Sequence, residues 1–364
     1  MIIDGDGHFF ETEEIFAKYM EPGMRNYRPR LLSDDEGHNF WVVDGQTPYK
    51  RPSIKGAGAP GTAAPPGKKI QAARRASVGS QTLTNPQERL DDLDREGIDV
   101  QFLYPSFLLH VNAWSDGALA MAVCRAYNSW LAEVCKQAPD RLKAVGVVAL
   151  QDPQGAAEEL YRLRDLGMKS VMINGTAGVK RLDHPEHEPF FAAANRLQTA
   201  IAVHFSLQFP LVDTLFEHHF PNRVLAGIFP IMAGLTSVLC SGLLDRYGNL
   251  KFAFLEGGIS WVPAHLERMD DHFANPRYGA KDLIDHPPSD YLQTGRIFFG
   301  CEGNEPFLSR LIKEVGEDLF IYSSDYPHAD RTEGTARYLQ ARDDMSEIAR
   351  HKLLEKNARR FYGL

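Results

Sequence analysis

The sequence predicts an α/β fold in the form of a (β/α)8 TIM barrel. Short apolar stretches alternate with segments of helical periodicity from residue 85 onward, and a further apolar stretch opens the chain. The stretches are nearly continuous apolar runs, which is typical of parallel strands covered on both faces. Eight such units fit a chain of 364 residues as one domain over 1–364, because barrels of this size are commonly single domains.

The first strand, at residues 2–8, is followed by an amphipathic segment over 12–32 and then by a break in the pattern. Residues 33–85 are rich in proline and glycine, so we expect an inserted loop region or lid there rather than a barrel element. The interval between Asp44 and Glu88 has no acidic residue and a charge of +7, whereas the whole chain has a net charge of −8. Its basic residues are Lys50, Arg51, Lys55, Lys68, Lys69, Arg74 and Arg75.

A regular alternation of helices and strands begins at Asn85. Asn85 and Pro86 form a helix N-cap and first-turn proline, and Gly97 ends this helix. The remaining strands are expected at 100–104, 144–150, 170–174, 200–204, 251–256, 297–300 and 319–325, with helices between them and after the last.

Composition and charge exclude several classes of protein. A hydrophobic content of 43% excludes wholesale disorder, and the net charge of −8 argues against a general nucleic-acid binder. Four scattered cysteines without a CxxC pair fit a reducing cytoplasm and exclude a thiolate zinc site. Asp4 and Asp6 stand where a signal peptide needs basic residues, so export is not expected. Val224–Leu244 has no charged residue over 21 positions, but its proline and glycines favour a buried helix over a membrane span.

Polar residues end most of the predicted strands. Asp6 and His8 end the first strand, Asn174 the fourth, His204 the fifth, Glu256 the sixth and Asp325 the eighth, while Glu302 follows the seventh. The carboxyl ends of barrel strands meet on one face, where the active sites of such barrels lie. Two histidines and several carboxylates at one mouth would repel one another without a cation, so we expect a metal site there. For Asn174 we favour a hydrogen-bonded core position.

The same residues carry a resemblance to a known family. Asp6-x-His8, His204 in Ala-Val-His-Phe, and Ser-Ser-Asp325-Tyr-Pro-His328 resemble the amidohydrolase-related TIM-barrel family, which includes aminocarboxymuconate-semialdehyde and resorcylate decarboxylases. With the stretch Leu255–Asp270, the resemblance covers essentially the whole chain. It implies that Asp6, His8, His204 and Asp325 bind metal, and that His328 is a further ligand or supports one.

The chain departs from the pattern of this family at two positions. The decarboxylases place an acid/base histidine just past the sixth strand, where this chain has Glu256. The fourth strand ends in Asn174, not in the lysine that binuclear hydrolases carbamylate. The donors that remain outnumber those that one catalytic metal needs, and they suit iron or manganese. The candidate ligands are Asp6, His8, Glu11, His204, Glu256 and Asp325.

This donor set resembles that of the nonheme di-iron monooxygenases of the amidohydrolase fold. We therefore expect two Fe ions that activate O2 to hydroxylate a large apolar acyl substrate. The candidate catalytic residues are Glu256, Asp325, His328 and Glu302. A coenzyme A thioester would explain the basic insertion, because its phosphates could meet Lys68, Lys69, Arg74 and Arg75.

Two alternatives remain open. The first is a mononuclear Zn or Mn enzyme, a decarboxylase or hydrolase in which the metal polarises a carboxylate or carbonyl and Asp325 or Glu256 acts as base. The second is a barrel that has lost its chemistry and only binds ligands, which the retained ligand set disfavours. The sequence is compatible with a homo-oligomer and identifies neither the substrate nor an electron donor.

Overall fold

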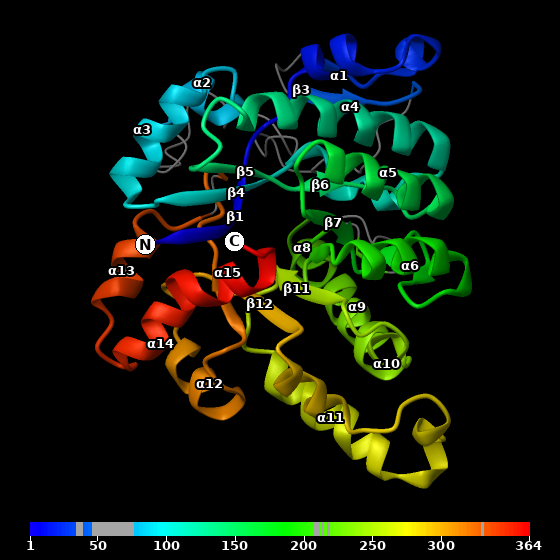
Figure 1. The fold of residues 1–364 in the computed structure, drawn as a ribbon, viewed down its shortest axis with the longest axis vertical. Coiled ribbons are helices and arrows are strands. Elements are labelled where there is room, and N and C mark those ends of the chain that lie inside the picture. The colour runs from blue at the N-terminus through cyan, green and yellow to red at the C-terminus, as the bar shows by residue number, and fades with distance from the viewer. Residues whose placement is uncertain (34–38, 46–75, 207–211, 213–214, 217–218, 329–330) are drawn as a thin grey trace.

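The computed structural model describes residues 1–33, 39–45, 76–206, 212, 215–216, 219–328 and 331–364. Its strands lie in the interior and its helices surround them (Figure 1). Two parallel sheets, β1-β4-β5 and β13-β12-β11-β10-β7-β6, supply the barrel wall. The barrel strands are β1 (Ile3–His8), β4 (Val100–Tyr104), β5 (Leu142–Ala144), β6 (Gly146–Val147), β7 (Ser170–Asn174), β10 (Ala200–His204), β11 (Lys251–Leu255), β12 (Ile297–Cys301) and β13 (Phe320–Tyr322).

Backbone hydrogen bonds join the two sheets into a closed barrel. β5 and β6 are two halves of the third barrel strand, and the amide of Val145 between them donates to the carbonyl of Leu103 at 3.3 Å. On the other side, the amide of Asp325 donates to the carbonyl of Asp6 at 3.0 Å, so the segment after β13 pairs with β1. The predicted (β/α)8 barrel is therefore confirmed.

Helices follow the barrel strands, as the alternation in the sequence predicts. The α-helices are α1 (Glu13–Tyr19), α2 (Val78–Thr82), α3 (Pro86–Glu96), α4 (Gly117–Cys135), α5 (Pro153–Asp165), α6 (Glu188–Leu197), α8 (His219–Ala226), α9 (Phe229–Cys240), α10 (Leu243–Arg246), α11 (Val262–Ala274), α12 (Leu308–Val315), α13 (Thr335–Ala341), α14 (Glu347–His351) and α15 (Asn357–Tyr362). Short 3-10 helices are η1 (Pro22–Tyr27), η2 (Phe107–Ala113), η3 (Pro185–His187), η4 (Pro276–Tyr278), η5 (Ala280–Asp282) and η6 (Pro288–Thr294), and η7 (Lys352–Lys356) is a π-helix turn.

The predicted insertion is described only in part. Its described parts include the end of β2 (Arg30–Ser33), which pairs antiparallel with β3 (Asn39–Val42), and the helix α2. Another antiparallel pair, β8 (Thr176–Ala177) and β9 (Lys180–Arg181), lies after β7. Lys68, Lys69, Arg74 and Arg75 lie outside the described residues, so the insertion remains a prediction at these positions.

The apolar segment that resembles a membrane span belongs to the barrel wall. Phe220–Cys240 is long and apolar enough to cross a membrane by length and composition alone. In the structure it is divided into α8 and α9, and α9 packs on β7, β10 and β11. A Cβ atom added at Gly175 would lie 1.7 Å from the carbonyl oxygen of Pro230, so the start of α9 contacts the end of β7 directly. The buried residues of α9 agree with the buried helix expected from the sequence, whereas Phe220 and Val224 of α8 are exposed.

Candidate metal centre

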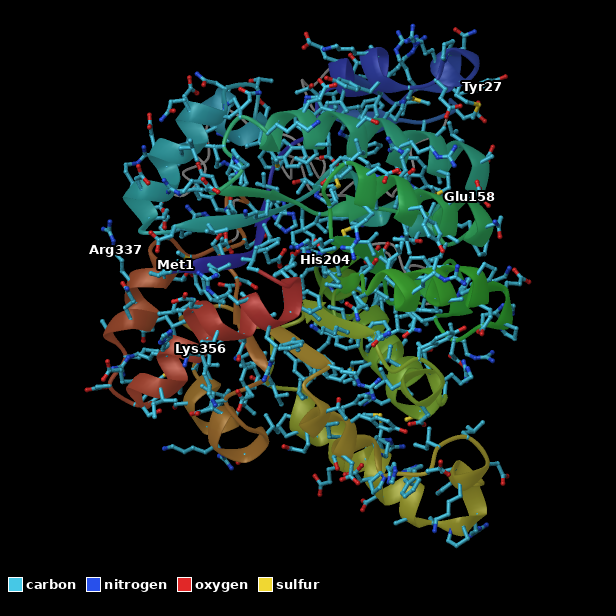
Figure 2. All side chains as sticks on the ribbon, viewed as in Figure 1. Met1, Tyr27, Glu158, His204, Arg337 and Lys356 are labelled. Carbon is cyan, nitrogen blue, oxygen red and sulfur yellow. The ribbon has the colours of Figure 1, made fainter. Side chains whose placement is uncertain are left out.

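The strand ends bring two histidines and three carboxylates to one side of the barrel. Asp6 and His8 come from β1, His204 ends β10, Glu256 follows β11, and Asp325 follows β13. Figure 2 shows His204 in the interior of the molecule. The register of β1 against β4 shifts between Asp4 and Gly7, and such an irregularity re-aims the side chains of a strand end.

The donor atoms lie at separations typical of metal ligands. The Nε2 atoms of His8 and His204 each lie 3.2 Å from Oδ1 of Asp6. His8 Nε2 also lies 3.5 Å from Oδ1 of Asp325, and Oε2 of Glu256 is farther, at 3.9 Å from His8 and 3.7 Å from His204. Ligand atoms about 2.0–2.2 Å from a common ion lie roughly 3–4 Å from one another. The donors form two groups that share His8, within each of which the ligand atoms all lie within 4.8 Å of one another. One group is Asp6, His8 and His204, and the other is His8, Glu256, Asp325 and His328.

Hydrogen bonds fix which nitrogen of each histidine faces the centre. Nδ1 of His8 lies 2.7 Å from the carbonyl oxygen of Pro105, and Nδ1 of His204 lies 3.2 Å from that of Phe205. A carbonyl oxygen only accepts, so each Nδ1 carries a hydrogen, and each Nε2 faces the carboxylates and offers a lone pair there when its ring is neutral. Lone pairs facing anionic oxygens repel unless a cation lies between them, and this orientation therefore favours a bound metal ion.

Unpartnered atoms support the same conclusion. Oδ2 of Asp6, Nε2 of His8 and Oε2 of Glu256 are buried and have no hydrogen-bond partner among the described residues. Buried polar atoms are almost always paired, so a cluster of such atoms calls for an explanation. A metal ion coordinated by Asp6 and His8 would satisfy the atoms of these two residues.

In the protein without metal, burial and the neighbouring charges shift the pKa values of the donor residues. Burial alone would raise the pKa of Asp6, but His204 and His8 outweigh it and hold that pKa below its ordinary value. Burial lowers the pKa of His8, and His328 acts in the same direction. Burial would also lower the pKa of His204, but Asp6 and Glu256 raise it. Burial and the charge of Asp325 raise the pKa of Glu256 well above its ordinary value.

Two of the carboxylate residues have an unusual backbone. Glu256 has φ +56° and Asp325 has φ +54°, in the left-handed region that L-residues other than glycine seldom occupy. Such conformations persist where the surrounding structure holds them, and they concentrate at functional sites. Both side chains are thereby turned toward the centre at a cost in backbone energy.

A hydrogen-bonded chain supports Asp325. Nδ1 of His328 lies 2.6 Å from Oδ1 of Asp325, and Nε2 of His328 lies 2.8 Å from Oγ of Ser106. The ring of His328 stacks on that of His8 with the centroids 4.3 Å apart. Ser106 is a residue that the sequence analysis missed, although its position just after β4 is one more strand end.

A second buried network fixes the backbone beneath the site. Oδ1 of Asp4 accepts a hydrogen bond from the amide of Ser324 at 2.9 Å, and Oδ2 of Asp4 accepts one from Nε2 of Gln101 at 2.8 Å. Nη1 of the buried Arg89 donates to the carbonyl oxygen of His8 at 2.9 Å. These contacts hold the backbone at His8 and just before Asp325, so they are positioned to preserve the geometry of the donors.

Some predicted site residues lie elsewhere. The carboxylate of Glu11 accepts hydrogen bonds from the amides of Ser106, Phe107 and Leu108 at 2.9–3.0 Å, at the start of η2. Burial raises the pKa of Glu11 to about 7, although these amides act in the opposite direction. The potential metal-binding groups found among the described residues include neither Glu11 nor Glu302. The amide of Glu302 donates to Oε1 of Glu305 at 3.1 Å, and the catalytic role expected for its side chain stays a prediction.

Asn174 has the structural role that its position in the sequence suggested. Its Nδ2 atom donates to the carbonyl oxygen of Leu109 at 2.8 Å and to that of His204 at 3.2 Å. Asn174 therefore braces the end of β10 from the neighbouring strand.

Comparison with known proteins decides the family. The family model described as amidohydrolase matches residues 3–364, which is nearly the entire chain. The chain belongs to the amidohydrolase family. The resemblance stated from the sequence motifs is thereby confirmed.

The curated proteins to which this amidohydrolase is similar include decarboxylases. It is 29% identical over 294 residues to the gamma-resorcylate decarboxylase of Rhizobium sp. (strain MTP-10005), covering 76% of this chain and 86% of the relative. It is 25% identical over 289 residues to the 2-amino-3-carboxymuconate-6-semialdehyde decarboxylase of Dictyostelium discoideum, covering 77% of each chain.

Solved structures share the fold. A 5-carboxyvanillate decarboxylase from Novosphingobium aromaticivorans, crystallised with bound manganese, is 22% identical with a TM-score of 0.73 and covers 100% of this chain and 97% of its own. An amidohydrolase from Mycobacterium avium subsp. paratuberculosis is 21% identical with a TM-score of 0.78, covering 100% and 99% of the two chains.

These findings correct the function expected from the sequence. The interpretation as an O2-dependent di-iron monooxygenase is wrong, because the relatives are decarboxylases and the solved neighbour holds manganese, not iron. The coenzyme A-linked acyl substrate and O2 are wrong as partners for the same reason. The geometry also removes one of the six proposed ligands, because the carboxylate of Glu11 binds backbone amides.

Proposed function

We propose that this amidohydrolase is a metal-dependent decarboxylase of an aromatic carboxylate. The observation that carries the proposal is that the Nε2 atoms of His8 and His204 each lie 3.2 Å from Oδ1 of Asp6, while His8 Nε2 also lies 3.5 Å from Oδ1 of Asp325. The names of the relatives, which include gamma-resorcylate decarboxylases, support the reaction and the class of substrate. This reading corresponds to the mononuclear alternative considered from the sequence.

Four residues would hold the ion. Asp6, His8, His204 and Asp325 supply two carboxylates and two imidazoles, a mixed set that suits manganese, and the neighbour with bound manganese points to the same metal. When bound, such an ion polarises substrate oxygens and orients the substrate. Nδ1 of His8 and Nδ1 of His204 each keep their hydrogen bond to a backbone carbonyl, which holds the Nε2 atoms toward the ion.

Glu256 is the residue that we assign to proton transfer. Its carboxylate lies farther from the two histidines than that of Asp6, and its side chain is the most exposed of the carboxylates, at 18%. In the reaction, the bond between the ring carbon and the carboxylate carbon breaks and its electron pair stays on the ring carbon. Glu256 gives a proton to that carbon as CO2 leaves, and then regains a proton from solvent.

His328 is a positioning residue in this proposal. Its contacts with Asp325 and Ser106 fix the carboxylate of Asp325 in place, so that this ligand need not reorient when the ion binds. Reduced reorganisation is how a rigid polar site favours the transition state.

Purified protein loaded with manganese provides the test. We expect CO2 release from at least one hydroxylated benzoate, at the same rate in air and under argon, with loss of activity in EDTA and recovery on adding manganese. The proposal fails if no hydroxylated benzoate releases CO2, or if turnover depends on O2.

The cytoplasmic location expected from the sequence is part of this proposal. Cys124, Cys135, Cys240 and Cys301 are all free thiols, as a reducing compartment requires.

A further inference from the structure

A pocket of about 440 Å³ lies between α3 and α13. Its lining includes Arg95 and Glu96 of α3, Arg337 of α13 and Arg331 in the loop before α13. Figure 2 shows Arg337 at the edge of the molecule, whereas His204 lies in the interior. The described residues that line this pocket include none of the proposed metal ligands.

Arg331 is a buried cation whose hydrogen-bond donors are only partly used. Its side chain is 2% exposed, and its Nη2 atom lies 3.2 Å from Oε1 of Glu96. Its Nε and Nη1 atoms are buried and have no hydrogen-bond partner in the part of the chain that the structure describes. A guanidinium remains protonated, so these donors cannot be removed by deprotonation. Burying charged donors without acceptors costs free energy, and an acceptor from outside the chain is therefore expected.

The surroundings hold Arg331 in place. Its guanidinium carbon lies over the ring of Tyr326, 4.6 Å from the centroid, and that of Arg89 lies 4.8 Å from the same centroid. The hydroxyl of Tyr326 donates to the carboxylate of Asp92 and lies 3.1 Å from Oγ of Ser80. Because its hydroxyl is held in this way, the Tyr326 ring is a fixed support for the guanidinium of Arg331.

Two carboxylates of the pocket already accept hydrogen bonds elsewhere. Oδ1 of Asp92 pairs with Arg95, while its Oδ2 holds the contacts described above. Oε1 of Glu96 accepts from Nη2 of Arg331, and Oε2 of Glu96 accepts from the amide of Gly334 at 2.9 Å. Neither acid meets Nε or Nη1 of Arg331. The missing acceptor must therefore enter the pocket.

The remaining charged residues limit the size of the group that can enter. Nη2 of the exposed Arg337 donates to the carbonyl oxygen of Arg95 at 2.5 Å, so this cation meets a neutral group at the rim. Glu333 also lines the pocket, and with it three arginines face three acids. A large polyanion would be repelled by these acids, whereas a small oxyanion can approach Arg331 alone. Guanidinium donors form their strongest hydrogen bonds with such oxygens.

We propose that the pocket beside Arg331 is a binding site for a small oxyanion, a phosphate or carboxylate group, that accepts hydrogen bonds from Arg331 and is attracted by Arg95 and Arg337. The site uses neither the metal nor the substrate of the decarboxylase, so it does not depend on the function proposed above.

The test measures the binding of inorganic phosphate and of acetate by calorimetry at constant ionic strength. The full-length chain is first freed of metal and of chelator, so that the anion cannot bind an ion at the barrel mouth. The proteins are wild type, Arg331→Gln, Arg331→Lys and Arg337→Gln. Arg310→Gln is the matched control, because Arg310 is an arginine of α12 whose side chain is 75% exposed.

We expect wild type to bind one of the two anions, with affinity at least about tenfold lower in Arg331→Gln and partly kept in Arg331→Lys. Arg337→Gln should weaken binding by about two- to fivefold, and Arg310→Gln should not change it. Binding of phosphate alone identifies a phosphoryl group as the ligand, and binding of acetate alone identifies a carboxylate.

Thermal melting shows whether each variant is folded, and Arg337→Gln decides if Arg331→Gln is not. No binding of either anion to wild type would mean that water alone meets the donors of Arg331, and the proposal would be wrong. It would also be overturned by equal affinity in a folded Arg331→Gln, by an equal loss in Arg310→Gln, or, where Arg331→Gln does not fold, by unchanged affinity in Arg337→Gln.

Discussion

Nε2 of His204 lies 3.2 Å from Oδ1 of Asp6, although the two residues are 198 positions apart in the chain. The same oxygen lies 3.2 Å from Nε2 of His8. One carboxylate oxygen thus faces two imidazole nitrogens whose other nitrogens bind backbone carbonyls. Closure of the barrel creates this meeting point, because it brings the carboxyl ends of β1 and β10 to a common mouth.

Replacing His204 by alanine should remove the metal and leave the fold. The loss of metal affinity should exceed the roughly 10- to 100-fold loss that follows removal of a residue supporting a ligand. Elemental analysis after gel filtration measures the metal, and circular dichroism reports the fold, which we expect to be kept because apolar packing stabilises a barrel of this size. His351→Ala, which removes an exposed histidine, is the control. A His204→Ala protein with full metal content would disprove the assignment.

The fold could be predicted because its signals are local and repeated. Each barrel strand is a short apolar run, and each run is followed by a segment of helical periodicity, so errors at single boundaries do not change the architecture. The third strand shows the limit: it was expected at 144–150, but the structure has β5 and β6 at Leu142–Ala144 and Gly146–Val147. No sequence pattern predicts the interruption of this strand at Val145.

The site could be predicted only where a residue directly ends a strand. His8 and His204 end their strands, Glu256 and Asp325 follow theirs within three residues, and Asp6 lies two residues before the end of β1. Glu11 lies three residues after His8 in sequence, but the chain has turned there and its carboxylate meets the amides of η2. Counting donors does not reveal such a turn, which is why six candidate ligands suggested two metals.

Residues whose role depends on tertiary contacts could not be identified from a sequence pattern. Arg89 looks like an exposed arginine of an amphipathic helix, yet it is buried and bonds the carbonyl of His8. Ser106 is one serine among many until the fold places it 2.8 Å from His328.

Ser106→Ala should lower turnover without removing the metal. Without the hydroxyl, the ring of His328 loses the contact that fixes its Nε2 side, and the carboxylate of Asp325 loses a rigid partner. We expect kcat to fall by about 10- to 100-fold, as for other residues that orient a ligand, while metal content stays near that of the wild type. Ser129→Ala in α4 is a suitable control, since Ser129 bonds the carbonyl of Arg125 away from the site. If Ser106→Ala keeps the kcat of the wild type, the hydrogen bonds from Ser106 through His328 to Asp325 have no catalytic importance.

His110 should make stability depend on pH. Burial lowers its pKa to about 3 in the folded protein, with Arg223, His204 and His328 acting in the same direction, against about 6.5 in the unfolded chain. Between these values the unfolded state binds more protons, so the free energy of unfolding rises with pH and is lost as pH falls below about 6.5. The slope for one such group approaches about 1.4 kcal/mol per pH unit.

The measurement is urea unfolding of wild type and His110→Gln between pH 5 and 7.5, both in EDTA so that metal loading does not vary. Wild type should lose about 2 kcal/mol more than His110→Gln between the upper and lower ends of this range. Other histidines with lowered pKa, namely His8, His187 and His265, are present in both proteins, so their contributions cancel. Parallel curves for the two proteins would show that His110 is protonated equally in the folded and unfolded states.

Glu256→Gly should lower the decarboxylase activity without lowering the stability of the metal-free protein. A left-handed backbone costs an L-residue roughly 1–2 kcal/mol relative to glycine, and the φ of +56° at Glu256 lies in that region. The substitution also removes a buried carboxylate beside Asp325 and Asp6, which repel it in the metal-free protein. Glycine gives the unfolded chain more conformational freedom, and this lowers the free energy of unfolding by up to about 1 kcal/mol. The metal-free variant should therefore be as stable as wild type or more so, while decarboxylation falls at least about 100-fold through loss of the proton donor.

Gln198→Gly separates the backbone effect from the site. Gln198 has φ +52° at the end of α6, away from the metal centre, so the substitution relieves the same kind of strain without touching a donor. We expect a similar backbone gain with unchanged activity, and the difference in the free energy of unfolding between the two variants then measures the repulsion among the carboxylates. If Glu256→Gly were clearly less stable than Gln198→Gly, the carboxylate of Glu256 would be stabilising the folded chain. That result would contradict the claim that Glu256 destabilises the metal-free protein.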